Sequence, residues 1–327
     1  MAKSSGPLDR EHLHRRLRQF LQRLRHGDEV AHLITLLAAL SIVIVTVLLV
    51  YQLFLNSALP RQKFGFAFFA GRTWDPVSGD FGALPFIYGT VVSSALALLI
   101  AVPLGVGAAI FLSELAPLRI SNALTFVIEL LAAVPSVIYG LLGIFILLPV
   151  LRKVVMPFLK STLGFLPFFK GPIYGVSMLA GGVVLAIMIV PFIISVSREV
   201  LLAVPVEQRE AALGLGATRW ESTWQVVVPF ARAGIMASVF LALARALGET
   251  MAVTMVIGND PKISASLFAP AYSIAAVIAN EFTEATGDLY LQALIELGLV
   301  LFLLTILING LARLAIIATT QKASQAR

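Results

Sequence analysis

The chain has 327 residues, of which 59% are hydrophobic and only 13% are charged, and this composition excludes an ordinary water-soluble fold. Its formal charge of +6 comes from basic residues scattered between apolar runs, which argues against nucleic acid as a partner. The absence of cysteine excludes disulfides, thiolate metal sites and cysteine nucleophiles. Four scattered histidines give no metal-ligand spacing, and no catalytic set of residues stands out.

Apolar runs long enough to cross a bilayer occur about six times, and they predict an all-α, polytopic membrane protein. The expected spans are 33–55, 88–112, 123–150, 174–196, 234–257 and 289–318. The first run is too long for a signal-peptide core, so we expect an uncleaved anchor. The chain then divides into a basic amphipathic segment (1–32), a six-helix membrane domain (33–318) and a short tail (319–327).

Basic residues favour one orientation of these spans. They are frequent before the first span, between the fourth and fifth spans, and at the end of the chain. With six spans these segments lie on one side of the membrane, which the positive-inside rule makes the cytoplasm. Eight basic residues remain for the other side. The sequence therefore predicts both termini and the loop at about 197–232 in the cytoplasm.

Prolines and small residues interrupt the apolar runs. Pro103, Pro135 and Pro191 are expected to break the second, third and fourth spans, because proline removes a helical hydrogen bond. Clusters of small residues allow close helix packing. They occur at Gly105 to Ala108, at Gly140 and Gly143, and at Ala180 to Gly182. Packing alone explains most of these glycines, but together with the breaks they favour an interlocked bundle around a path for a solute.

The loop between the fourth and fifth spans carries Glu210-Ala211-Ala212, then Gly216, then an apolar stretch that ends at Pro229. It predicts two short helices joined by a tight turn, the second opened by a Thr218–Glu221 capping box and closed by Pro229. Alanines leave a low surface that a partner's groove can approach closely. The simpler interpretation is a solvated helix–turn–helix loop without a partner.

Arg245 and Glu249 stand four residues apart in the fifth span, so we expect them on one helix face. Charge at membrane depth is costly and needs a partner or a wet cavity. One hypothesis is a structural ion pair. The other is an anion site, in which the planar guanidinium binds paired oxygens and Glu249 orients it.

Weaker candidates for the same path are Glu129, Ser136, Tyr139 and Thr250. Glu129 is expected at a membrane edge or in an interhelical hydrogen bond rather than in contact with a solute. Ser136 and Tyr139 follow Pro135, where they can donate to an anion or satisfy backbone groups that the break leaves free.

The spacing of the loop resembles the EAA loop of ABC-importer permeases, with Val226 and Val228 where that family usually has Ile and Leu. The resemblance implies the type I (MetI-like) permease fold. It also implies that Glu210, Ala211, Ala212, Gly216 and Pro229 belong to a coupling segment that docks on a separate ATPase subunit.

Three further stretches resemble PstC-type permease subunits of phosphate-specific ABC importers. They are Ala246–Asn259 in the fifth span, Phe81–Thr90 before the second, and Glu129–Gly140 in the third. This resemblance implies inorganic phosphate as solute, a PstA-like second permease, two copies of a cytoplasmic ATPase and an external phosphate-binding protein. It places the chain in the bacterial inner membrane, with ATP and Mg²⁺ bound by the ATPase, since this chain lacks a phosphate-binding Gly-Lys-Ser/Thr loop.

Other functions remain open from the residues. The loop does not discriminate phosphate from sulfate or molybdate. The PstA-like sister subunit shares Ala-Leu-Gly-Glu-Thr, but typically continues with Ala-Pro where this chain has Met251-Ala252. A secondary transporter would use Arg245, Glu249 and Glu129 as an ion relay, and it leaves the loop spacing unexplained. A non-transporting scaffold leaves the intramembrane charges unexplained.

Overall fold

The computed structural model describes residues 28–325, with side chains described for 30–314. The predicted amphipathic segment before the first span lies outside the described residues. The described chain divides into two compact units, one ending at Leu55 and the other beginning at Asn56. The first unit contributes helix α2 (Asp28–Leu55), an apolar helix whose window of highest hydropathy is fully exposed. Long apolar runs become helices because only a helix satisfies its own backbone in hydrocarbon.

Six helices of the described chain are long and apolar enough to cross a membrane, which confirms the predicted number. They are Val30–Leu55, Leu84–Leu115, Ser136–Leu163, Met178–Leu202, Arg219–Leu247 and Asp288–Leu314. The last of these is part of helix α16 (Asp288–Gln325), which continues beyond the expected span end at 318.

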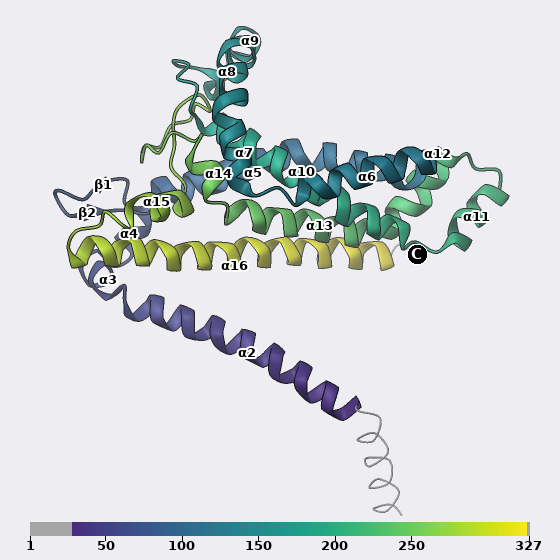
Figure 1. Cartoon of the computed structure of the whole chain (residues 1–327), viewed down its shortest axis with the longest axis horizontal. Helices are drawn as coiled ribbons and strands as arrows, with labels where there is room; N and C mark the ends of the chain where they lie inside the picture. The colour runs from purple at the N-terminus through teal and green to yellow at the C-terminus, as the bar shows by residue number, and fades with distance from the viewer. Residues whose placement is uncertain (1–27, 326–327) are drawn as a thin grey trace, which may run out of the picture. The chain divides into compact units, whose positions relative to one another are not determined.

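The second unit is a bundle in which α5 (Leu84–Ile110), α10 (Met178–Leu202), α13 (Val228–Leu247) and α16 pack along one another (Figure 1). Helix α10 is the central one: 67% of its membrane window is buried, against 33% or less in the other candidate spans. The buried hydroxyls of Ser197 on α10 and Ser238 on α13 form a hydrogen bond of 2.7 Å. A buried hydroxyl pair of this kind fixes the register of two helices.

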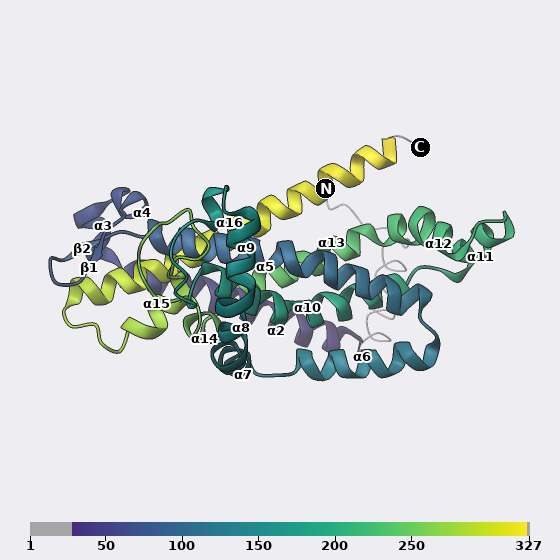
Figure 2. The same cartoon turned by 90° about the horizontal axis from the view of Figure 1, so that it is seen from above.

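Small elements cover the two ends of this bundle, and Figure 2 shows the same separation from above. At one end lie α3 (Ala58–Phe64), α4 (Ala67–Ala70), the hairpin β1 (Trp74–Asp75) and β2 (Asp80–Phe81), and α15 (Ile274–Glu281). In the antiparallel hairpin Trp74 pairs with Phe81. At the opposite end lie α11 (Val206–Gly214) and α12 (Arg219–Ser222).

Four π-helical segments each end two residues before a proline. They are η1 (Phe111–Leu115), η2 (Gly143–Leu147), η3 (Leu151–Val155) and η5 (Thr223–Val227), followed by Pro117, Pro149, Pro157 and Pro229. A proline ring collides with the carbonyl four residues earlier, and in every case that carbonyl lies in the widened π turn. The π segment thus relieves the clash, and in three of the four cases the helix continues through the proline.

Pro229 is one of those three, so the prediction that it closes the second loop helix is wrong. Residues Arg219 to Leu247 form a continuous helix through α12, η5 and α13. Pro103 and Pro191 likewise lie inside the unbroken helices α5 and α10, and the breaks predicted there do not occur.

The break predicted at Pro135 is confirmed. Helix α6 (Leu118–Ala132) ends before it, and α7 (Ser136–Leu142) begins after it. Through η2, α8 (Leu148–Val150) and η3, α7 continues into α9 (Met156–Leu163), and this arm leaves the bundle at a steep angle (Figure 1). The third apolar run, expected at 123–150, is therefore two helices. A short 3-10 turn, η4 (Pro167–Phe169), follows the arm.

Close packing at the glycines is confirmed for most of the predicted positions. A Cβ added at Gly105 would lie 2.7 Å from Ile193 Cγ2, and one at Gly182 would lie 2.5 Å from Leu96 Cδ2. Both contacts join α5 to α10, so these glycines let the two helices pack closely. At Gly107 an added Cβ would meet nothing within 4 Å, so this glycine has no packing role among the described residues.

Candidate functional site

The candidate site has an intramembrane part, formed where two helices are interrupted. Helix α13 ends at Leu247, and α14 (Met251–Thr254) begins after three residues. Helix α14 packs against α7, which itself begins directly after the Pro135 break. Gly140 allows this contact, because an added Cβ there would lie 3.2 Å from the Cα of Ala252. The polar residues of both breaks are thereby brought into one region.

Arg245 and Glu249 do not share a helix face, and this corrects the prediction. Gly248 caps α13, so Glu249 lies beyond the helix. The Glu249 carboxylate turns forward and accepts a hydrogen bond of 3.2 Å from the backbone N–H of Ala252, in the first turn of α14. This is the side-chain capping that an orphan N–H at a helix start requires.

Arg245 is exposed on the surface of this chain. Among the residues whose side chains the structure describes, it has no hydrogen bond and no ion pair, with Glu249 or with any other group. Its guanidinium is near enough to Tyr139 for an electrostatic interaction. A cation at this depth that has no hydrogen bond or ion pair among the described side chains needs another partner, such as water, another chain or an anion.

The weaker candidates differ in whether their side chains already form hydrogen bonds within the described part of the chain. The Tyr139 hydroxyl is buried and donates to the carbonyl of Leu131 at 2.7 Å, across the Pro135 break. It therefore satisfies backbone, as one of the two hypotheses expected. The Thr250 hydroxyl donates to Gly248 O at 3.3 Å. Ser136 is half-buried and Glu129 is exposed, and neither side chain has a hydrogen bond within the described part of the chain.

The second part of the candidate site is the helix pair at the end of the bundle. The capping box is confirmed: Glu221 N donates to Thr218 Oγ1 at 3.2 Å, and Thr218 N donates to Glu221 Oε2 at 2.8 Å. Gly216 adopts φ +90°, a left-handed conformation that favours glycine, and this ends α11 sharply. Ala212 is half-buried, whereas Glu210 and Ala211 are exposed, as is Leu215 to 91%.

Sequence reasoning missed the residues beneath this helix pair. The side chain of Arg209 on α11 is only 19% exposed and forms an ion pair with Glu114 of η1, at 2.9 Å between Nη2 and Oε1. The two residues are 95 positions apart, so no periodicity in the sequence connects them. The only sequence signal for this ion pair was the position of Glu114, an acidic residue directly after an apolar run.

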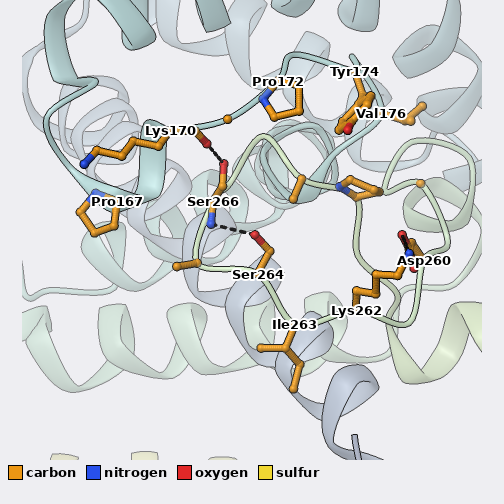
Figure 3. A pocket seen from close by; sticks show the side chains of 15 residues that line it. Pro167, Lys170, Pro172, Tyr174, Val176, Asp260, Lys262, Ile263, Ser264 and Ser266 are labelled. Atoms are coloured by element: carbon orange, nitrogen blue, oxygen red, sulfur yellow. Dashed lines mark hydrogen bonds and ion pairs between the residues drawn. The ribbon is translucent and has the colours of Figure 1, made fainter. Parts of the chain in front are cut away.

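A pocket of about 870 Å³ lies away from both parts, between the loop after α9 and the loop after α14. Figure 3 shows the Ser266 hydroxyl joining the two loops by donating to Lys170 O, while the Ser266 N–H donates within its own loop to Ser264 Oγ at 3.2 Å. Lys262 is paired with Asp260 at 3.1 Å, while the Lys170 ammonium points away from that pair. Hydrogen bonds within and between the loops, rather than an open basic site, account for this pocket.

The fold and these features define a multi-pass helical membrane protein with a projecting helix pair and a polar break inside its bundle. A family model described as "Binding-protein-dependent transport system inner membrane component" matches residues 101–316. A phosphate transport system permease protein PstC of Mesorhizobium japonicum is 49% identical over 297 residues, covering 90% of this chain and 91% of the relative.

A PstC of Haemophilus influenzae is 47% identical, covering 86% of this chain and 90% of the relative. A probable PstC of Methanocaldococcus jannaschii is 36% identical, with coverage of 88% and 92%. A solved MetNI methionine ABC transporter chain superposes with a TM-score of 0.49 at 17% identity, covering 72% of this chain and 94% of that chain. The present chain belongs to the family of binding-protein-dependent transport system inner membrane components and, within it, to the PstC permeases.

Proposed function

We propose that this chain is the membrane-spanning subunit of an ATP-driven importer of inorganic phosphate. The observation that carries the proposal is Arg245, an exposed intramembrane arginine without a hydrogen bond or ion pair in the described part of the chain. The names of the relatives supply the solute, phosphate.

The chemistry of the break suits a phosphate oxyanion. A guanidinium presents a planar fork of donors, which matches two oxygens of one phosphate. Because Glu249 accepts from Ala252 N instead of pairing with Arg245, the fork stays free. Ser136 is a further donor of the same region. The hydroxyl protons of Thr250 and Tyr139 are donated to backbone carbonyls, so these two residues and Glu129 remain weaker candidates for the path. An anion held by few groups can also leave, as transport requires.

Energy in this proposal comes from a partner. The exposed face of α11 offers Glu210, Ala211 and Leu215 to a groove on a separate ATPase subunit, with Ala212, Gly216 and Pro229 shaping the segment. ATP and Mg²⁺ would be bound by two copies of that ATPase, and this chain would have no ATP site and no cofactor of its own.

Arginines around the helix pair favour a cytoplasmic location for it by the positive-inside rule, with both termini on the same side. Two of them, Arg219 and Arg232, are exposed. The membrane would then be the bacterial inner membrane. The remaining partners are a PstA-like second permease, which would complete the path beside Arg245, and an external phosphate-binding protein at the opposite end of the bundle.

In the proposed transport cycle, the α11 segment receives the movement of the ATPase and Arg245 binds phosphate. Closure of the ATPase dimer draws the α11 segments of the two permeases together and opens the bundle outward. Phosphate passes from the binding protein to Arg245, and hydrolysis returns the bundle to its inward-facing state. Alternating access of this kind needs rigid helices that move as units.

Uptake of labelled phosphate by cells that depend on this chain tests the proposal. Arg245→Gln is expected to lower uptake by about 100-fold, because a hydrogen bond to a charged group is worth up to about 3 kcal/mol. Arg232→Gln is the matched control, since Arg232 is an exposed arginine of the same helix without a partner in the described chain. Normal uptake by Arg245→Gln at equal membrane levels would refute the role of Arg245.

Excess unlabelled sulfate in the same assay separates phosphate from other oxyanions. Resistance of uptake to sulfate supports phosphate. Suppression by sulfate would move the solute to another tetrahedral oxyanion while leaving the transport mechanism in place.

A further inference from the structure

The Arg209 side chain donates four hydrogen bonds. Its Nε donates to Glu114 Oε2 at 3.1 Å, and its Nη2 donates to Glu114 Oε1 at 2.9 Å. Nη2 also donates to Leu201 O at 2.7 Å, and Nη1 donates to Val204 O. One guanidinium therefore joins three segments: α11, the end of α10, and η1, which extends α5.

Each segment presents its acceptor for a local reason. Leu201 lies in the last turn of α10 and Val204 follows that helix, and the carbonyls at a helix C-terminus carry partial negative charge that attracts a cation. Glu114 lies in the widened turn that precedes Pro117. With its side chain only 9% exposed, Glu114 has little water to replace a lost partner.

Apolar packing reinforces the same junction. Leu112, Leu201 and Val204 belong to one buried cluster, which also contains Val227 of η5 and Ala231 of α13. The first turn of α6 is tied to η1 as well, because the buried Ser121 hydroxyl donates to Leu112 O at 2.8 Å. The guanidinium thus closes a rigid corner in which the ends of α5, α6, α10 and α13 meet.

The two faces of α11 have different roles. Arg209 points into the corner, whereas Glu207 and Glu210 on the same helix are exposed and have no partner in the described chain. A partner can therefore hold the outer face without displacing the inner ion pair.

We propose that the Arg209–Glu114 pair is a positioning strut, which makes α11 move as one body with the helices that begin and end at this corner. The inference rests on the proposed function, in which α11 receives the push from the ATPase. The strut converts that push into movement of the second and fourth spans. A bidentate arginine–carboxylate pair suits this role because two parallel bonds fix orientation as well as distance.

The first test measures phosphate imported per ATP hydrolysed by the assembled complex in proteoliposomes. Glu114→Gln keeps the shape of the side chain and removes its charge, so we expect hydrolysis to continue while the ratio falls by at least about tenfold, the lower range for a lost charged hydrogen bond. Arg209→Lys keeps the charge without the fork, and an intermediate ratio is expected. Glu199→Gln is the matched control, because it breaks an exposed ion pair with Arg198 on α10, outside α11, and it should leave the ratio unchanged.

A loss of assembly, hydrolysis and uptake in equal proportion in Glu114→Gln would make the pair a folding element only, and it would overturn the strut. An unchanged ratio would do the same. Thermal unfolding of each purified complex shows which variants are folded.

The second test does not depend on the solute. The chain has no cysteine, so Val206→Cys on α11 and Leu118→Cys at the start of α6 give two unique spin-label sites. Both positions are exposed, to 59% and 81%. We expect their distance distribution in the complex to be the same with and without ATP, and to broaden when Glu114→Gln is added.

A distance that changes with ATP while the pair is intact would overturn the strut. If the complex instead imports a different anion, the proposed solute fails, but the label distances still decide the strut. The two failures are therefore distinguishable.

Discussion

Arg209 and Arg245 are arginines of one polypeptide with opposite surroundings. The Arg209 guanidinium donates hydrogen bonds to Glu114, Leu201 and Val204, and its side chain is 19% exposed. Arg245 is exposed and has no partner among the described residues. The comparison teaches that an arginine satisfied by its own chain holds segments together, whereas one left unsatisfied at membrane depth is available to something that arrives.

The stability of the chain in detergent gives the largest expected contrast. Arg209→Ala leaves the Glu114 carboxylate buried and unpaired, and breaking such a pair costs about 3–5 kcal/mol of unfolding free energy. Arg245→Ala removes no bond and should change the unfolding free energy by less than about 0.5 kcal/mol. Denaturant unfolding of both variants measures the difference, and equal losses would break the comparison.

Tyr139 and Ser136 extend the comparison to neutral groups. Tyr139→Phe removes the hydrogen bond to Leu131 O across the Pro135 break, so we expect a loss of about 1 kcal/mol in unfolding free energy. Ser136→Ala removes no bond within the described chain and should leave stability unchanged. Thermal unfolding at matched protein and detergent concentrations tests both, and a greater loss in Ser136→Ala would contradict the structure.

Glu249 and Glu129 give the smallest contrast. Glu249→Ala removes the acceptor for Ala252 N, and the loss of such a cap costs about 1 kcal/mol or less at a short helix. Glu129→Ala, at an exposed carboxylate, is the control and should be neutral. If Arg245→Ala and Glu249→Ala are equally destabilising and the double variant loses no more stability than either single variant, the two side chains interact after all.

Much of the architecture could be predicted because it follows from local chemistry. A backbone segment in hydrocarbon must satisfy its own hydrogen bonds, which favours a helix, so the long apolar runs predicted the six candidate membrane-spanning helices. The Thr218–Glu221 capping box is local and was predicted correctly. The prolines were harder, because a π turn before Pro229 lets the helix continue, while Pro135 breaks its helix. Nothing in the sequence around either proline distinguishes these two outcomes.

The candidate site divides in the same way. The sequence alone determined that charge lies within the fifth apolar run and that a polar loop precedes it, because both are properties of neighbouring residues. Only the tertiary structure decided the partners. Glu249 lies beyond the end of α13 and bonds to Ala252, and Glu114 meets Arg209 across 95 positions. A buried charge takes whichever partner the packing of distant helices brings within reach, and no sequence spacing encodes that choice.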